Sequence, residues 1–418
     1  MRTFLLFVFL LLRCVPLSDA ASGLVSVDER VEWRLLDSFQ GMITRSEFEK
    51  RVSEFCPDDT VYDYLEFDGN DSVTVWSQPE DEEERKPSWT LTFRQQDPPP
   101  AEQFDQAWLR DLRGISRDRP LKGMRICLDP GHIGGDWANL EERYFRIGRS
   151  EPVKEGDLTR MTMELIAPQL EDLGAEVVWT ARQSQPATSW RPDDLEMSAI
   201  QFMFETRPNL FRTTGSSFLK YLNWRKEFLF YRRMEIRARA ERIAELQPDV
   251  TLCLHYNAAP WRGRVRLFRV NKVVIFVHGS YMPEELEKEE HRYHLFNKVL
   301  QYDRPTEIQV GSAIASQMKE KWSWPPENYA GSGYSHAIEG EPYLWSRNLL
   351  ANRLFSGPVI FVEGPYMNDY ETYYRLQAGD YEGTKTIRGT EHRSIFREFS
   401  EIVVQGLINY SKERNLME

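Results

Sequence analysis

Three short, largely apolar runs in this sequence each lead into a histidine or a glutamate. The runs and the residues they lead into are 124–129 with His132, 250–254 with His255, and 359–362 with Glu363. Runs of this length, bounded by turn residues, are typical of strands buried on both faces of a parallel sheet. Because the carboxyl ends of parallel strands meet at one edge of a sheet, we expect the three side chains to gather there.

The rest of this region alternates between helical and strand patterns. Helical spacing is present at 156–173, 232–246, 284–294, 311–321 and 392–410, and two more strands are expected at 176–180 and 273–278. Strands separated by helices predict an α/β fold with a mainly parallel twisted sheet and helices on both faces.

A small α+β module is expected before this fold. Its helices are predicted at 31–39 and 46–55, the second capped by Ser46, and its strands at 62–67, 72–76 and 89–93. A proline run at 98–100 suggests a stiff linker. The expected segments are a signal peptide at 1–20, the module at 21–97, a linker at 98–121 and a catalytic domain at 122–418 with an insertion at 183–231.

The first twenty residues have the pattern of a secretory signal. Arg2 precedes an apolar run of nine residues, 4–12, and small residues stand at Ser18 and Ala20. A membrane-spanning helix needs about 20 apolar residues. We therefore expect export to the periplasm or the medium, with no transmembrane helix after removal of the signal.

The net charge of −12 argues against a nucleic-acid partner, whose binding needs a basic surface. Three cysteines remain after the signal segment, and none forms a CxxC pair, which argues against a thiolate metal site. Of these, Cys127 and Cys253 lie within apolar runs, and we expect them to be buried.

The residues at the strand ends have the composition of a hydrolytic metal site. Such a zinc site needs three protein ligands and an open position, and two histidines with one glutamate are a standard set. A separate carboxylate must move the proton of the attacking water. Together with Glu155, at the start of a predicted helix, the residues His132, His255 and Glu363 fill these roles.

Several segments resemble, in the same order, the motifs of the zinc-dependent N-acetylmuramoyl-L-alanine amidases of the amidase type 3 class. These segments are 126–132, 154–158, 180–182, 254–258, 311–318 and 359–364, with Arg239 sixteen positions before His255. The resemblance covers about residues 122–410. It implies one zinc ion per chain on His132, Glu155 and His255, with Glu363 as the catalytic acid and base.

The implied reaction is hydrolysis of the amide bond between N-acetylmuramic acid and L-alanine in peptidoglycan. The resemblance further suggests that Asp129 orients His132, and that Asn257 and Arg239 hold a ligand in place or contact the substrate. Because the wall is itself polyanionic, a chain of this charge must bind it through local contacts.

The sequence departs from the family pattern at three places. The first histidine is followed by Ile133 and is separated from Glu155 by about twenty residues. Glu141 or Glu142 in this stretch could replace Glu155 as a metal ligand. Tyr256 stands where a small residue is usual. The insertion 183–231, or the segment 284–300, could restrict access or bind an activator protein, or could simply decorate the outer face.

The remaining motifs of the sequence do not favour another kind of site. The segment 290–294 carries two histidines in a run of charges, and we expect it to be a solvated helix face. There is no HExxH or GxSxG motif. Two rival functions stay open: a wall-binding protein without activity, and a zinc amidase or peptidase for another muropeptide-like substrate.

Overall fold

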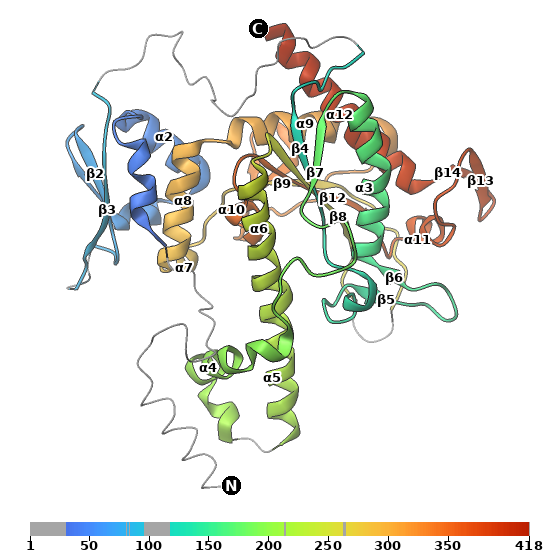
Figure 1. The fold of residues 1–418 in the computed structure, drawn as a ribbon, viewed down its shortest axis with the longest axis horizontal. Helices are drawn as coiled ribbons and strands as arrows, with labels where there is room; N and C mark the ends of the chain where they lie inside the picture. The colour runs from blue at the N-terminus through green and yellow to red at the C-terminus, as the bar shows by residue number, and fades with distance from the viewer. Residues whose placement is uncertain are drawn as a thin grey trace. The chain divides into compact units, whose positions relative to one another are not determined.

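The structure is a computed structural model that describes residues 31–95 except 81 and 83, 118–212, 215–261 and 265–417. The predicted signal peptide and most of the predicted linker lie outside these residues. The described chain forms two compact units, a smaller one of residues 188–237 and a larger one of 31–187 and 238–417 (Figure 1). Within the described residues, no helix combines the length and apolarity needed to cross a membrane.

The larger unit is built on a seven-stranded sheet in the order β10-β11-β9-β12-β8-β4-β7. The strands are β4 (Arg125–Pro130), β7 (Glu176–Trp179), β8 (Val250–Asn257), β9 (Val274–Val277), β10 (Ser335–Ile338), β11 (Glu341–Arg347) and β12 (Val359–Tyr366). The four neighbours β12, β8, β4 and β7 run parallel to one another. β9 runs antiparallel to β12, β11 is parallel to β9, and β10 is antiparallel to β11.

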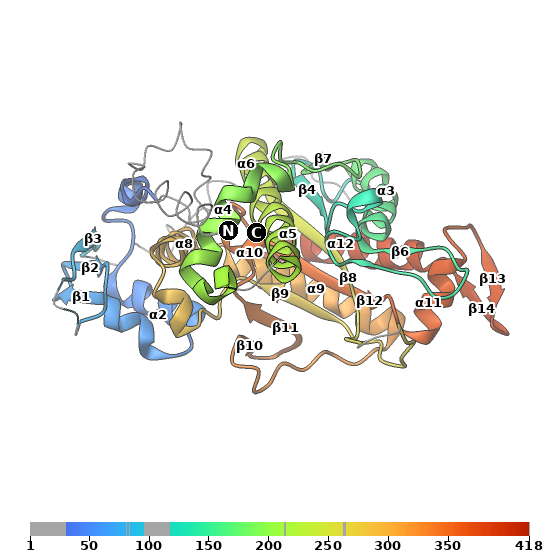
Figure 2. The ribbon, with the colours of Figure 1, turned by 90° about the horizontal axis from the view of Figure 1, so that it is seen from below.

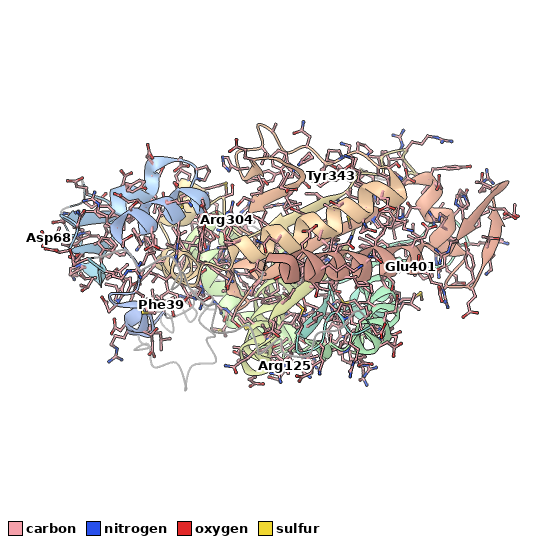
Figure 3. The ribbon with its side chains drawn as sticks, turned by 90° about the horizontal axis from the view of Figure 1, so that it is seen from above. Phe39, Asp68, Arg125, Arg304, Tyr343 and Glu401 are labelled. Carbon is pink, nitrogen blue, oxygen red and sulfur yellow. The ribbon has the colours of Figure 1, made fainter. Side chains whose placement is uncertain are left out.

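Helices cover both faces of this sheet, and the predicted α/β class is confirmed. They are α3 (Glu155–Asp172), α6 (Glu235–Leu246), α9 (Arg304–Trp322) and α12 (Ile395–Met417). Alternate strand residues such as Ile126 and Leu254 share one apolar core with α3, α9 and α12. Their neighbours point the other way, where Asp129 bonds to Arg239 of α6. Figure 3 shows α9 and α12 alongside each other, with Glu401 on α12.

The central strands β4, β8, β9 and β12 are buried on both faces, as their apolar runs require. Cys127 and Cys253, on the face away from the α3, α9 and α12 core, are both buried and free, so their predicted burial is confirmed. Burial raises the pKa of both thiols, which keeps them protonated and unreactive.

The N-terminal module has a three-stranded antiparallel sheet covered by helices. Its elements are η1 (Trp33–Phe39), α2 (Arg45–Phe55), η2 (Asp59–Tyr64), β1 (Leu65–Asp68), β2 (Ser72–Trp76) and β3 (Pro87–Thr92). The cap of α2 is Thr44, which forms a reciprocal capping box with Glu47. The predicted cap, Ser46, was wrong by two residues. Thr44 and Ser46 each offer a hydroxyl followed by a glutamate three positions on, so the sequence pattern fits both residues.

The module shares its core with a segment more than 180 residues further along the chain. α7 (Pro283–Leu286) and α8 (Glu289–Gln301) supply apolar side chains such as Phe296 and Val299 to the cluster that holds Phe48 and Leu91. Figure 1 shows α8 beside α2. The predicted domain boundaries at 97 and 121 stay a prediction.

The expectation that 290–294 is a solvated helix face was wrong. Glu290, His291, Arg292 and His294 on α8 are all buried. The apolar residues that follow them on the same helix pack into the module, and this buries most of the helix. The buried guanidinium of Arg292 replaces its hydrogen bonds to water by donating to the carbonyl oxygens of Leu286 and Ser77.

Shorter elements surround the sheet. They are η4 (Gly135–Trp137), β5 (Tyr144–Phe145), β6 (Val153–Lys154), α10 (Leu350–Leu354), α11 (Tyr370–Gln377), β13 (Thr384–Ile387) and β14 (Thr390–Arg393). β5 pairs with β6 and β13 with β14, each as an antiparallel hairpin. The β5–β6 hairpin leads directly into α3, and Figure 2 shows the strands β13 and β14 next to each other.

The smaller unit is helical, although the sequence shows no clear period there. Its elements are η5 (Pro192–Leu195), α4 (Glu196–Thr206), η6 (Pro208–Arg212), α5 (Ser216–Leu229) and η7 (Phe230–Met234), followed by the first residues of α6. Lys226 binds Asp193 at 2.8 Å and Glu196 at 3.3 Å, and the guanidinium of Arg225 lies 3.3 Å from the ring centre of Phe202. The helices of this insertion are therefore joined by charged and aromatic contacts.

Candidate metal centre

Strand register brings the predicted residues to one edge of the sheet. In the parallel pair β12–β8, Glu363 lies directly opposite His255, and in the pair β4–β8, Pro130 lies opposite Leu254. His132 follows β4 by two residues, and Glu155 is the first residue of α3. Paired residues on neighbouring parallel strands lie about 4.8 Å apart and point to the same face. The side chains of Glu363 and His255 are therefore neighbours.

Three of these side chains form a compact group of possible metal ligands. His132, Glu155 and His255 each offer one ligand atom, and these atoms all lie within 4.8 Å of one another. Nε2 of His132 is 3.3 Å from Oε2 of Glu155, and Nδ1 of His255 is 3.0 Å from Oε1 of Glu155. Zinc bonds of about 2.0–2.1 Å in a tetrahedron place neighbouring ligand atoms roughly 3.3 Å apart. The donor set and its spacing therefore fit a zinc ion.

The backbone at the end of β4 allows this close approach. A Cβ atom on Gly131 would lie 2.5 Å from the imidazole of His255, so only glycine fits there. The next residue, His132, has a φ of +65°, which turns its ring back toward the sheet. The N–H of Gly131 donates to the carbonyl oxygen of Leu254 at 2.9 Å and joins this loop to β8.

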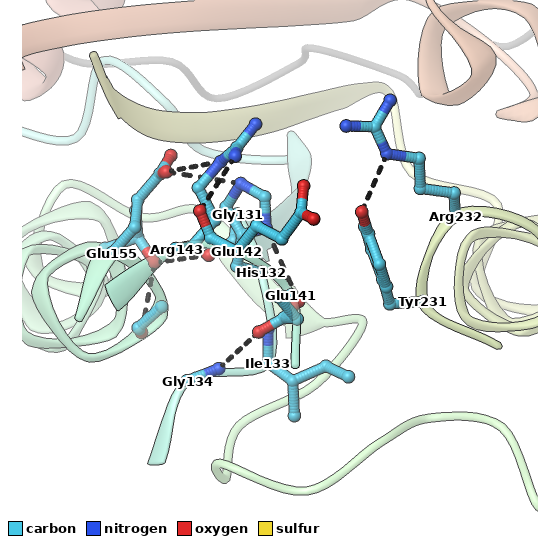
Figure 4. A network of polar contacts seen from close by, with 12 residues as sticks. Gly131, His132, Ile133, Gly134, Glu141, Glu142, Arg143, Glu155, Tyr231 and Arg232 are labelled. Atoms are coloured by element: carbon cyan, nitrogen blue, oxygen red, sulfur yellow. Dashed lines mark hydrogen bonds and ion pairs between the residues drawn. The ribbon is translucent and has the colours of Figure 1, made fainter. Parts of the chain in front are cut away.

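Glu141 holds the outer side of the His132 ring. Its buried carboxylate lies 3.4 Å from Nδ1 of His132 and accepts the N–H groups of Ile133 and Gly134 at 2.9–3.1 Å, as Figure 4 shows. A carboxylate on the second nitrogen of a metal-binding histidine fixes the ring's tautomer and orientation. The sequence offered Glu141 only as a competing ligand, and the exposed Glu142 likewise lies outside the ligand group.

Asp129 and Arg239, two residues singled out in the sequence, meet behind the loop. Nη1 of Arg239 donates to Asp129 at 3.0 Å and to the carbonyl oxygen of Pro130 at 2.6 Å, and its Nη2 donates to the carbonyl oxygen of His132 at 3.2 Å. Asp129 also accepts the hydroxyl of Thr180. Asp129 thus reaches His132 through Arg239 and the backbone, while Glu141 is the carboxylate on the ring.

Asn257, suggested as a substrate contact, lies at the end of β8. Its side-chain oxygen accepts the N–H of Ala258 at 2.8 Å, and its carbonyl oxygen accepts the N–H of Met367. The side chain is partly exposed, and its contact with a substrate stays a prediction. Tyr256, the departure from the family pattern, points into the core, where its hydroxyl bonds to Thr162 at 2.8 Å.

Charges at the site shift the protonation of its members in opposite directions. Burial lowers the pKa of His132, but the carboxylates of Glu155 and Glu141 outweigh it and raise that pKa to about 9. Burial raises the pKa of Glu155, but the two histidines outweigh it, so that the pKa of this carboxylate is lowered. For Glu363, burial and the charge of Glu155 prevail over the histidines, and its pKa is raised.

Arg143 lies at the exposed side of the group. Its Nε is 3.2 Å from Oε2 of Glu155, while 37% of its side chain stays exposed. Its charge also acts on Glu363. Sequence inspection missed this residue, because the arginine belongs to the stretch between the motifs and matches none of them. On the inner side, the ring of Phe361 stacks on His255 with centroids 4.2 Å apart and holds the imidazole in place.

The arrangement can hold a divalent ion and transfer a proton. Three ligand atoms converge from β8, α3 and the loop after β4, and a carboxylate with a raised pKa stands beside them. A group with a raised carboxyl pKa exchanges protons near neutral pH more readily than an ordinary one. The same edge of the sheet therefore offers three ligands for an ion and, beside them, a carboxylate that can carry a proton.

The chain is similar to several solved structures. One is the N-acetylmuramyl-L-alanine amidase Ami1 from Mycobacterium smegmatis, with 14% identity and a TM-score of 0.37 over 70% of this chain and 99% of that chain. Another is the N-acetylmuramoyl-L-alanine amidase from Clostridium difficile 630, with 11% identity and a TM-score of 0.39 over 70% and 98% of the two chains. No family model and no curated protein matches the sequence. At TM-scores below 0.5, these likenesses decide nothing about activity.

Proposed function

We propose that this protein is a zinc-dependent amidase that hydrolyses the bond between N-acetylmuramic acid and L-alanine in peptidoglycan. The convergence of His132, Glu155 and His255 beside Glu363 supports the proposal most strongly. These are the residues that the resemblance to amidase type 3 enzymes assigns to one zinc ion and to the catalytic acid and base.

His132, Glu155 and His255 would hold the ion. Zinc bound there supplies a Lewis acid for the scissile carbonyl and lowers the pKa of water. Glu141 keeps the His132 ring oriented toward the ligand group, and Phe361 does so for His255. Both contacts reduce the reorganisation needed when the ion and the substrate arrive.

Glu363 transfers the proton. Its carboxylate takes a proton from the attacking water and then gives it to the nitrogen of L-alanine, which leaves as an amine. The raised pKa of Glu363 suits both steps, because the group must bind the proton and release it within one turnover. Its position opposite His255 in the strand register places it within reach of the ligand group.

Arg143 contributes a positive charge at the open side of the site. It touches Glu155 while more than a third of its side chain stays exposed, so it can donate to an oxygen of the substrate. A fixed cation near the carbonyl stabilises the negative charge that develops during acyl transfer.

The proposal extends to the setting of the reaction. We propose export to the periplasm or the medium and peptidoglycan as the substrate, with an activator protein acting on the inserted segment. The rivals are a wall-binding protein without activity on the same fold and a zinc amidase or peptidase for another muropeptide-like substrate. The presence of all four residues of the site weighs against the first rival.

The test is hydrolysis of purified sacculi. The full chain with zinc should release free stem peptides, which mass spectrometry identifies by their N-terminal L-alanine, and a chelator should stop the release. Binding to sacculi without any release would favour the wall-binding protein. Release of fragments with a different N-terminus would favour the peptidase.

A further inference from the structure

A cavity of about 360 Å³ lies outside the metal centre. Its lining includes two cations, Arg269 and Lys272, and two aromatic rings, Trp324 and Tyr370. None of these residues belongs to the ligand group, and none was singled out in the sequence. Aromatic walls with a few convergent charged groups are typical of a binding site for a small polar ligand.

The cavity lies beyond the carboxyl end of β12, the strand that carries Glu363. Asn271 in its lining accepts the N–H of Tyr366 at 3.1 Å. Tyr366 is three residues after Glu363, and Asn271 is three residues before Val274, which pairs with Glu363. At about 3.3 Å per residue, both routes put the cavity roughly 10 Å from Glu363.

The acidic residues around the cavity are already engaged. Asp369 caps α11 and also accepts from the N–H of Val270 and the amide of Asn271. Glu371 lies 3.8 Å from both Arg375 and His392. The carboxylate of Asp369 is thus fully engaged, whereas that of Glu371 stays 58% exposed and lies toward Arg375 and His392.

The cations are arranged around an aromatic ring. The guanidinium of Arg269 lies 5.1 Å from the ring centre of Tyr370, and Arg388 donates to the hydroxyl of the same tyrosine at 2.6 Å. Lys272 binds Glu327 at 2.8 Å and keeps further N–H donors on the same ammonium group. Arg269 is exposed and its planar guanidinium can bind a carboxylate through two bonds.

We propose that this cavity binds a carboxylate of the peptide on the leaving side of the scissile bond. The inference rests on the proposed function, because it takes Glu363 as the point of cleavage. Two extended residues span roughly 7 Å, and the side chain of the second adds about 3 Å, which together match the roughly 10 Å between Glu363 and the cavity. In a chain of net charge −12, a local cluster of cations supplies the attraction for an acidic peptide that the protein as a whole lacks.

The experiment compares two matched substrates, N-acetylmuramoyl-L-alanyl-D-glutamate and its α,γ-diamide, of which only the first, the diacid, carries free carboxylates on the peptide. The zinc-loaded chain should cleave the diacid with a kcat/KM about 10-fold higher, since a charge-assisted hydrogen bond contributes this order of magnitude. Arg269→Gln should bring the ratio close to one, mainly through KM. Arg266→Gln, an exposed arginine in the same loop but outside the cavity lining, should keep the ratio.

Equal cleavage of the two substrates by the unchanged chain would overturn the inference and leave the proposed function intact. A preference that survives in Arg269→Gln would also overturn it. If neither substrate is cleaved, the proposed function fails for these muropeptides. Calorimetric binding of the same pair then tests the inference about the cavity. Tighter binding of the diacid, lost in Arg269→Gln, would support the inference, and equal binding of the two compounds would overturn it.

Discussion

The larger unit contains two clusters of histidine and glutamate with opposite environments. At the carboxyl edge of the sheet, His132 and His255 lie against Glu155, and the histidines stay partly exposed. On α8, His291 lies 3.5 Å from Glu290, and both are buried in contact with the N-terminal module. The residue types are the same, but only the strand ends leave an opening for an ion and a substrate.

The comparison shows that the surroundings of a histidine set the pKa of its imidazole and therefore its charge. At the strand ends, neighbouring carboxylates overcome burial and raise the pKa of His132. On α8, burial lowers the pKa of His291, and Glu290 only partly offsets it. The nearby His278 has its pKa lowered by burial and by the charges of Lys298 and Arg353. The first cluster attracts cations, whereas burial in the second one keeps the imidazoles uncharged.

The largest effect is expected for the ligands themselves. His132→Ala should reduce bound zinc from about one ion per chain to near zero, because the site loses one of three protein ligands. His291→Leu, which replaces a buried imidazole with an apolar side chain of similar size, should leave the zinc content unchanged. Metal analysis after dialysis measures both. Loss of zinc in His291→Leu with the fold intact would contradict the distinction between the two clusters.

Glu363→Gln should separate metal binding from catalysis. Turnover of muropeptides should fall by about 10²–10⁴-fold, because the amide cannot accept the proton of water. Zinc content should stay as in the unchanged chain, since Glu363 lies outside the ligand group. An active Glu363→Gln variant would assign the proton transfer to another residue.

Glu141 and Glu142 form a matched pair of adjacent glutamates. Glu141→Gln should weaken zinc affinity by about 10–100-fold, because the His132 ring loses its negative partner. Glu142→Gln, at an exposed position, should not change the affinity. Competition with a zinc-sensitive dye measures both constants. Equal affinities for the two variants would remove Glu141 from the support of the site.

The smallest effect concerns the pH dependence of stability. His278 has a folded pKa below the ordinary value of 6.5, so only the unfolded chain takes up its proton. Its contribution to the free energy of unfolding should therefore fall as the pH drops below 6.5, by up to about 1.4 kcal/mol per pH unit. His278→Gln should show a shallower loss between pH 7 and pH 5 in urea unfolding. His392→Gln, at a partly exposed position, is the control.

Much of the site could be predicted because its signals are local. An apolar run that ends in a histidine or a glutamate specifies a buried strand and a group at its end, whatever the rest of the chain does. The order of such runs along the chain predicted the α/β class and the gathering of His132, His255 and Glu363 at one edge. The burial of 290–294, where the prediction failed, and the antiparallel direction of β9 against β12, which no local pattern predicted, both depend on longer-range contacts.

Local patterns in the sequence predicted which residues can bind a metal, and placed His132 and His255 at strand ends and Glu155 at the start of a helix. Only the tertiary structure decided their partners. Glu141, rather than Asp129, reaches the ring of His132. Arg239 bonds to the carbonyl oxygen of His132, although the two residues are more than a hundred positions apart in the sequence. The apolar side chains of α8 pack into the core of the N-terminal module. Local pattern fixes what a segment can become, whereas burial and the pairing of charges depend on segments that meet only when the chain folds.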